Sequence, residues 1–256
     1  MTRISDEKII TTIETTLGDS NWEALNNKWQ LKRFIRQCRE VSRYAKKGDS
    51  ILDFGCGEGQ NSFILNALGM KVTGLDLAQH TIWKWIQADF HAYNGKKIPF
   101  KQNSFEHIVM FGVLEHVGSS KQDFNFSKTQ PERLRILREL YITLKPGGLL
   151  FIYNFPNKYS PIELVNGLLN LPAIHRGAEK QSLGQVRQLV KDAGFTVIKS
   201  GRSGVLPASI GFIFPELRDK VINRHYKIIS QIDTAIDFLV GRFFGQSNYV
   251  IAQKVK

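Results

Sequence analysis

Apolar positions follow two different periods along the chain, and the change falls near Asp49. In residues 29–47, apolar side chains recur at helical spacing, and a basic stripe follows the same period. We therefore predict an amphipathic helix in this segment. Its basic face is either solvated, the commoner meaning of a charge stripe, or a contact surface for phosphate or headgroups. The apolar positions are Leu31, Ile35, Cys38 and Ala45, and the basic positions are Lys32, Arg36, Arg39, Arg43 and Lys47.

From Asp49 onward, short apolar runs alternate with helical stretches, which is typical of a parallel sheet built from βαβ units. Helices are predicted over residues 131–144 and 183–193. We expect an α/β fold with a doubly wound, mostly parallel seven-stranded sheet. Its strands are predicted at residues 50–54, 71–75, 83–88, 107–111, 148–154, 195–200 and 248–255.

Two segments, residues 156–182 and 201–246, are not needed for such a sheet, and we expect them to be helical insertions over its carboxyl edge. The second contains a long predicted helix, residues 216–244, with one apolar face. We expect that face to pack as a lid, while the apolar run 205–214 leaves an interfacial role open. The apolar face comprises Leu217, Val221, His225, Ile228, Ile232, Ala235, Leu239 and Phe243.

The strongest chemical signal is a glycine-rich turn between a predicted buried strand and a predicted helix, Asp53-Phe54-Gly55-Cys56-Gly57-Glu58-Gly59. Glycines let a ligand lie against bare backbone, and a helix start offers free N–H groups, so a nucleotide-like ligand is expected. A dinucleotide fingerprint needs a third glycine where Gln60 stands, which weakens the NAD interpretation. Asp76, seventeen residues after the last glycine, occupies the strand end where an acid accepts the ribose hydroxyls.

The order of these and later motifs resembles that of class I S-adenosylmethionine-dependent methyltransferases. Residues 53–59 resemble the family's first motif, Asp76 its second-strand acid, and Asp89 its adenine-contacting acid. Residues 113–117 resemble the segment after the fourth strand, and residues 144–148 the turn before the fifth. Five motifs in the family's order are far more specific than one glycine loop.

This resemblance implies S-adenosylmethionine as the cofactor, held by a Rossmann-like core. The glycines would cradle its methionine portion and ribose, Asp76 would bind the ribose diol, and Asp89 would accept from the adenine amino group, with Leu77 and Phe90 as adenine walls. Asp76 and Asp89 lie only 13 residues apart, so the crossover helix between their strands must be curtailed or remodelled. The implied cofactor-binding residues are Asp53, Gly55, Cys56, Gly57, Gly59, Asp76, Leu77, Asp89, Phe90 and Val113.

Methyl transfer is an in-line displacement, so most of the rate can come from aligning the acceptor with the methyl group. A base is needed only if the acceptor must lose a proton. His116 is the candidate catalytic base, because it follows the fourth strand at the ligand-binding edge and imidazole titrates near neutrality. Alternatively, His116 caps a turn or orients Glu115. The other histidines lack metal-ligand spacing, so no metal is expected.

Composition adds a bias toward anionic partners. Lys and Arg number 35 against 23 Asp and Glu, a net charge of +12. Basic residues are not interleaved with aromatic ones in any compact segment, which makes nucleic acid a weaker expectation than a small molecule. The two cysteines, Cys38 and Cys56, do not form a disulfide framework. The sequence shows neither a signal-peptide pattern nor a transmembrane run, so we expect a cytoplasmic protein, with peripheral membrane contact left open.

We therefore expect a single methyltransferase domain over residues 1–256, with residues 1–48 as an N-terminal helical cap and residues 49–155 as the cofactor-binding core. Its expected function is transfer of a methyl group to an oxygen or nitrogen of a small-molecule acceptor. Residues 154–161 resemble bacterial methyltransferases of surface-polysaccharide and lipid pathways, which adds a sugar, a glycan precursor or a lipid-linked compound as the acceptor. The alternatives are an RNA or protein methyltransferase and a catalytically inactive methyltransferase-like binding protein.

Overall fold

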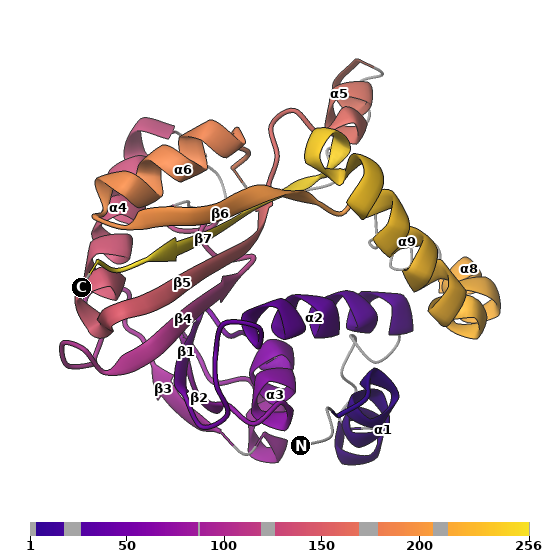
Figure 1. The fold of residues 1–256 in the computed structure, drawn as a ribbon, viewed down its shortest axis with the longest axis horizontal. Coiled ribbons are helices and arrows are strands. Elements are labelled where there is room, and N and C mark those ends of the chain that lie inside the picture. The colour runs from indigo at the N-terminus through magenta and orange to yellow at the C-terminus, as the bar shows by residue number, and fades with distance from the viewer. Residues whose placement is uncertain are drawn as a thin grey trace. The chain divides into compact units, whose positions relative to one another are not determined.

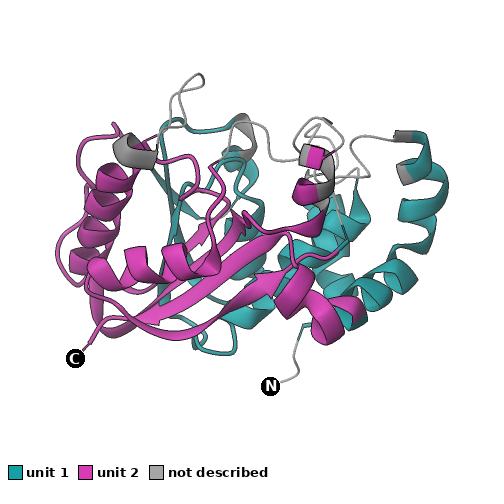
Figure 2. Cartoon of the chain, turned by 90° about the horizontal axis from the view of Figure 1, so that it is seen from above, with its two compact units in different colours: residues 1–92, 206–235 teal, residues 93–205, 236–256 magenta. Residues whose placement is uncertain are grey.

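The structure of the protein, a computed structural model, describes residues 4–17, 27–86, 88–118, 126–168, 179–206 and 215–255. The chain forms two compact units (Figure 2). The first comprises residues 1–92 and 206–235, and the second comprises residues 93–205 and 236–256.

Seven strands follow one another in the order β3-β2-β1-β4-β5-β7-β6 (Figure 1). In the first unit, β1, β2 and β3 pair in parallel. In the second, β4 and β5 are parallel, whereas β7 runs antiparallel to both β5 and β6. The expected mostly parallel, seven-stranded α/β fold is therefore confirmed. The strands are β1 (Ser50–Phe54), β2 (Lys71–Asp76), β3 (Asp89–Ala92), β4 (Phe105–Phe111), β5 (Leu144–Pro156), β6 (Thr196–Ser203) and β7 (Ser247–Gln253).

Helices form in the three predicted segments 29–47, 131–144 and 183–193, with shifted ends. The helix expected over residues 29–47 begins after Asn27, whose side chain accepts a hydrogen bond from the Gln30 N–H, and it ends at Val41. The segment 183–193 begins with a capping box at Ser182. The α-helices are α1 (Asp6–Leu17), α2 (Lys28–Val41), α3 (Gln60–Ala67), α4 (Phe126–Thr143), α5 (Pro161–Leu168), α6 (Leu183–Asp192), α8 (Pro215–Leu217) and α9 (Asn223–Phe244).

The third strand is not where the sequence predicted it. Residues 83–88 were expected to form it, but the strand is β3, and a 3₁₀ helix, Thr81–Trp85, precedes it. Trp83 and Ile86 carry the apolar signal in this stretch because both are buried in a helical turn. The expectation of a curtailed crossover helix is confirmed, since this five-residue 3₁₀ helix is the helix between β2 and β3.

The basic stripe of α2 joins α2 to its neighbours through ion pairs. Lys32 and Arg39 both bind the Asp6 carboxylate of α1, at 3.1 and 2.5 Å. Arg36 lies 3.5 Å from the carboxylate of Asp233 in α9. The apolar face predicted for this helix is buried. Most of the stripe therefore serves packing within the first unit, rather than presenting a row of free cations.

The long helix predicted over residues 216–244 is interrupted. A π-helical turn, Arg218–Ile222, separates α8 from α9, and His225 has non-helical dihedrals within α9. The turn accompanies burial of Ile222 against Trp29 of α2. Within the described ranges, no helix is both long and apolar enough to cross a membrane.

The face of this region that was expected to pack is instead exposed. Its large apolar side chains are between 41% (Leu217) and 69% (Leu239) exposed. The expected packing was wrong because other contacts hold this region, namely the buried Asp233 carboxylate of α9 and the buried Ile222 of the π-helical turn. The neighbouring apolar run at 205–214 lies mostly outside the described residues.

Candidate functional site

The glycine-rich turn follows β1 directly, and its backbone requires glycine. Gly55, Gly57 and Gly59 have φ angles of 73°, 52° and 84°, in the left-handed region that side chains disfavour. The Gly55 N–H donates to the Leu75 carbonyl of β2 at 2.7 Å, which fixes the start of the turn. The turn therefore exposes backbone at the carboxyl edge of β1 and leads into α3.

Asp76, the last residue of β2, is joined to this turn. Its Oδ2 accepts a hydrogen bond from the Gly57 N–H at 2.7 Å, and its Oδ1 accepts one from the Leu77 N–H at 2.6 Å. The Leu77 side chain next to it is 69% exposed. The structure thus brings together the predicted ribose acid, one predicted adenine wall and the glycine turn.

Trp83 is a residue of this region that sequence reasoning did not assign to the site. Its indole N–H donates to the Gly57 carbonyl at 2.9 Å, and its ring lies 5.1 Å from that of Phe90. A Cβ added to Gly59 or Gly74 would come within 3.0 or 2.2 Å of the Trp83 ring. The Trp83 ring therefore packs against the turn at Gly59 and leaves no room there for a side chain. The short interval between Asp76 and Asp89 was the available signal that a compact element lies there.

Asp53 and Cys56 lie underneath the turn. Asp53 is 1% exposed, and its Oδ2 accepts a hydrogen bond from the Ser62 hydroxyl at 2.6 Å. Burial raises the pKa of the Asp53 carboxyl to about 7, although the Ser62 hydrogen bond lowers it. Burial also raises the pKa of the Cys56 thiol. Both side chains are placed to support the turn from within the fold.

Asp89, the predicted adenine acid, lies away from Asp76. It is the exposed first residue of β3 and stands opposite Thr73, whereas Ala92 stands opposite Asp76. Asp89 is therefore three residues before the carboxyl edge, a distance of about 10 Å along a strand. The register does not bring the two acids together, and the adenine role of Asp89 stays a prediction.

His116 follows β4 in the second unit, within a tight turn. The turn begins with Gly112 at φ 71°, and the His116 N–H donates to the Val113 carbonyl at 2.9 Å. The imidazole is 55% exposed, while Val113 is half-buried. The placement of His116 after the strand is as expected, and its backbone takes part in the turn.

A buried arginine holds this turn from behind. Arg133 of α4 is fully buried and donates to the carbonyls of Leu114 and Glu115, at 2.8 Å each. Its guanidinium also lies 2.8 Å from a carboxylate oxygen of Glu179, which accepts a hydrogen bond from Thr129. No local pattern signals this contact, because Arg133 belongs to a helix that follows the turn in the chain.

Glu115 places a buried carboxyl next to the imidazole. Burial raises the pKa of Glu115 to about 8, while its own backbone N–H and the Arg133 charge lower it. Glu115 Oε1 lies 3.9 Å from His116 Nε2. Glu115 is therefore largely neutral at pH 7 and contacts His116 weakly. Among the residues that the structure describes, there is no cluster of three or more His, Cys, Asp or Glu side chains that could hold a metal ion.

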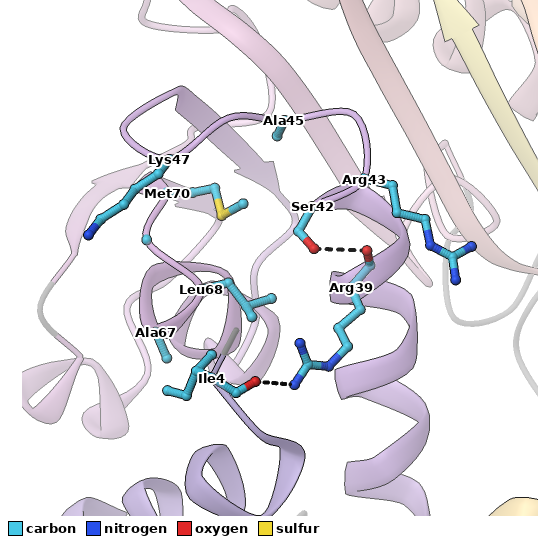
Figure 3. Close-up of a pocket in the computed structure, with 10 residues that line it drawn as sticks. Ile4, Arg39, Ser42, Arg43, Ala45, Lys47, Ala67, Leu68 and Met70 are labelled. Carbon is cyan, nitrogen blue, oxygen red and sulfur yellow. Dashed lines mark hydrogen bonds between the residues drawn. The ribbon is translucent and has the colours of Figure 1, made fainter. Parts of the chain in front are cut away.

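A separate hollow of about 550 Å³ lies at the opposite edge of β2, where α2 ends (Figure 3). Arg39 and Met70 help to line it, and Arg39 donates to the Ile4 carbonyl at 2.6 Å. Arg43 and Lys47 also line it, and their charged ends extend to opposite sides in Figure 3. This hollow is not part of the glycine-turn site, because Met70 precedes β2 and Asp76 ends it.

Comparisons with known proteins agree with this arrangement. Residues 27–200 match a family described as a methyltransferase domain. The chain is 32% identical over 121 residues to a ubiquinone biosynthesis O-methyltransferase of Xanthomonas campestris, covering 44% of this chain and 45% of that protein. It is 27% identical over 164 residues to a demethylmenaquinone methyltransferase of Listeria monocytogenes, covering 59% and 63%. The chain thus spans about half of the length of the curated relatives it matches.

Among solved structures, the fold is similar to that of a Thermotoga maritima protein described as an S-adenosylmethionine-dependent methyltransferase and possible histamine N-methyltransferase. The TM-score is 0.61 at 15% identity, over 96% of this chain and 99% of that one. At this identity the likeness shows the fold alone. The family match covers more than half of the chain. This chain therefore belongs to this methyltransferase-domain family, and its fold is that of S-adenosylmethionine-dependent methyltransferases.

Proposed function

We propose that this protein transfers a methyl group from S-adenosylmethionine to an oxygen or nitrogen of a small-molecule acceptor. The observation that carries the proposal is the hydrogen bond between Gly57 and the Asp76 carboxylate, which places an acid beside bare backbone at the carboxyl ends of β1 and β2. The family match and the two curated relatives support the reaction class.

The residues present fit this cofactor. A Cβ added to Gly57 would meet no described atom within 4 Å, so the turn is open on that side. Asp76 can release the Gly57 N–H and accept the two ribose hydroxyls instead. The exposed Leu77 side chain provides an apolar surface for the adenine ring. Asp89, Phe90 and Val113 remain predicted contacts.

The bound cofactor supplies an electrophilic methyl carbon on a sulfonium sulfur. The glycine turn and Asp76 would hold the cofactor, which would supply this methyl group to the acceptor atom and would be released as S-adenosylhomocysteine. Where the acceptor atom carries a proton, His116 accepts it at an imidazole nitrogen, which its 55% exposure leaves accessible. Arg133 holds the carbonyls of the turn and so fixes where the imidazole lies.

The names of the relatives and the charge of the chain indicate which kind of molecule receives the methyl group. The relatives' names refer to ubiquinone biosynthesis and to demethylmenaquinone, which favours a quinone-type small molecule as the first acceptor to test. An oxygen atom as the methyl acceptor is supported by the first of these names alone. A sugar, a glycan precursor and another lipid-linked compound are the further candidates. The net charge of +12 also favours an acceptor that carries an anionic group.

Calorimetric titration with S-adenosylmethionine, S-adenosylhomocysteine and NADH tests the cofactor part. We expect saturable binding of the two adenosyl ligands and none of NADH. Asp76→Ala should weaken that binding at least about tenfold, because charge-assisted hydrogen bonds to the ribose are lost. Asp49→Ala, which removes an acid at the other end of β1, is the matched control. Failure of the wild-type chain to bind either adenosyl ligand would refute the proposal.

Asp89→Asn in the same titration decides the adenine contact. A loss as large as that of Asp76→Ala would support the family's assignment. Unchanged affinity would follow from the position of Asp89 opposite Thr73.

Transfer of labelled methyl groups to quinols, sugars, lipid-linked glycans and RNA tests the acceptor part. The role of His116 as a base is tested with whichever acceptor is methylated. His116→Gln should lower kcat about a hundredfold or more and change the pH profile of kcat, without changing S-adenosylmethionine affinity. An unchanged pH profile would leave His116 as a turn residue only.

A further inference from the structure

The helix α9 is anchored through polar contacts on one face. The Asp233 carboxylate is fully buried and accepts hydrogen bonds from Arg33, at 2.6 and 2.9 Å, and from the Trp29 indole N–H at 3.3 Å. Farther along the same face, Asp237 accepts hydrogen bonds from the backbone N–H groups of Gly204 and Val205, each at 2.9 Å. Both acidic residues of α9 are thus occupied on the inward face.

The outward face of α9 carries an apolar stripe, which we define as Ile228, Ile232, Ala235, Leu239 and Phe243. Their spacing of three to four residues places them on one side of the helix. The four large side chains are between 50% (Ile232) and 69% (Leu239) exposed. Phe238, beside the stripe, is 87% exposed. A stripe of this size and order is unusual on a surface that contacts only water.

All three cations of α9 are exposed. Arg242 stands three residues after Leu239, which makes it a same-face neighbour of a stripe residue, whereas Arg224 precedes the kink at His225. Lys227 is 61% exposed and lies 4.0 Å from the Glu7 carboxylate of α1. The two carboxylates of α9 are therefore occupied inward, while its cations stay at the surface and Arg242 lies beside the stripe.

We propose that the apolar stripe of α9 is a docking surface for an anionic lipid bilayer, on which the helix lies parallel to the membrane plane. A helix with this division of faces inserts its apolar side chains at the boundary between headgroups and acyl chains, while its cations bind the anionic headgroups. The inference goes beyond methyl transfer and does not depend on which acceptor is used.

Charge favours a bilayer over a second copy of this chain. Two stripes packed against each other would bring the exposed cations of both helices to one interface, with no α9 carboxylate on the outward face to offset them. RNA would be attracted by the cations, but it would leave the aliphatic stripe in water. A bilayer with anionic headgroups satisfies both features.

Co-sedimentation of the full chain with vesicles tests this proposal. We expect binding to phosphatidylcholine vesicles that contain phosphatidylglycerol, and weak binding to phosphatidylcholine alone. The double variant Ile232→Ser/Leu239→Ser should lower the affinity about tenfold or more through lost apolar burial. Arg242→Gln should lower the affinity for anionic vesicles about fivefold. The matched controls are Ile142→Ser and Arg138→Gln, both at exposed positions of α4, and neither should change binding.

A fluorophore at the stripe gives a second readout that does not depend on a loss of binding. Both native cysteines are buried, so Leu239→Cys can be labelled selectively with an environment-sensitive dye. Its emission should shift to the blue on anionic vesicles, whereas labelled Ile142→Cys should not respond.

Three results would overturn the proposal. One is equal binding to neutral and anionic vesicles, or none to either. Another is an unresponsive Leu239 label on vesicles that do bind the chain. The third is a dimer in sedimentation velocity that Ile232→Ser/Leu239→Ser dissociates, which would assign the stripe to a second copy. Titration of these variants with S-adenosylmethionine keeps the test separate from the proposed reaction, because the stripe is remote in sequence from the glycine turn.

Discussion

The ends of β1 and β4 resemble each other, yet they are held by different means. Each strand is followed by a glycine in left-handed conformation, Gly55 at φ 73° and Gly112 at φ 71°. Each also has a buried carboxyl nearby, Asp53 or Glu115, whose pKa burial raises to about 7 or about 8. After β1, backbone groups and the neighbouring strand fix the turn. After β4, a buried cation from a distant helix does so.

The difference shows which kind of site a local motif can specify. Three left-handed glycines and one strand-end acid largely define the turn after β1, and all of them lie within 22 residues of one another. The turn after β4 depends on Arg133 and Glu179, which lie 18 and 64 residues after Glu115 in the sequence. The β1 turn should therefore be sensitive to backbone changes, and the β4 turn to loss of one guanidinium.

The largest effect should follow removal of that guanidinium. Arg133→Met leaves the carbonyls of Leu114 and Glu115 without their donor and Glu179 without its cation, and we expect a loss of about 3–5 kcal/mol in the free energy of unfolding. Urea denaturation measures it. Arg138→Met, at an exposed position of the same helix, should change stability by less than about 0.5 kcal/mol. Equal losses in both variants would mean that Arg133 does not hold the turn.

Alanine substitutions at Gly57 and Gly59 should distinguish the cost of a left-handed backbone from the cost of steric overlap. Gly59→Ala introduces a Cβ that meets Ile86 Cδ1 at 2.3 Å, at a φ of 84°, and should cost about 2–4 kcal/mol in unfolding free energy. Gly57→Ala meets no such neighbour, so only the backbone term of about 1 kcal/mol is expected. Thermal unfolding of the two variants compares them, and an equal loss would show that Trp83 and Ile86 do not pack as described.

The buried carboxyl after β4 should make stability depend on pH. The pKa of Glu115 is about 8 in the folded protein and 4.5 ordinarily, so between these values the folded state binds more protons than the unfolded state. Stability from this group therefore falls as pH rises from about 4.5 to about 8, by at most about 1.4 kcal/mol per unit. Glu115→Gln should flatten that slope in urea titrations at several pH values. An unchanged slope would locate the dependence elsewhere, with Asp53→Asn as the comparison.

The smallest effects concern the apolar residues next to each site. Leu77→Ala removes an exposed side chain, so stability should stay within about 0.5 kcal/mol while S-adenosylmethionine affinity falls about threefold to tenfold. Val113→Ala should give a similar affinity loss if Val113 contacts the cofactor. Calorimetric titration decides both. A stability loss without an affinity loss at Leu77 would remove it from the cofactor site.

Much of this architecture was predictable because its signals are local. Alternation of apolar runs with helical periods predicted six of the seven strands, and the left-handed glycines and Asp76 lie where the motif placed them. Two local predictions failed. Trp83 and Ile86 resembled a strand but form a buried turn, and the apolar stripe of α9 was expected to pack but is exposed. In both cases, hydrophobicity showed which side chains avoid water in principle, but not which contacts were available to them.

The sequence by itself determined the α/β class, the glycine turn and its acid, because each depends on residues close in the chain or on a repeated period. Tertiary structure alone decided that Arg133 holds the turn after β4, that Asp89 lies away from Asp76, and that Asp233 anchors α9 by its polar face. These outcomes depend on strand register and on buried charges that pair across long stretches of chain. The pattern of apolar and polar residues along the chain contains no information about strand register or about long-range pairs of buried charges.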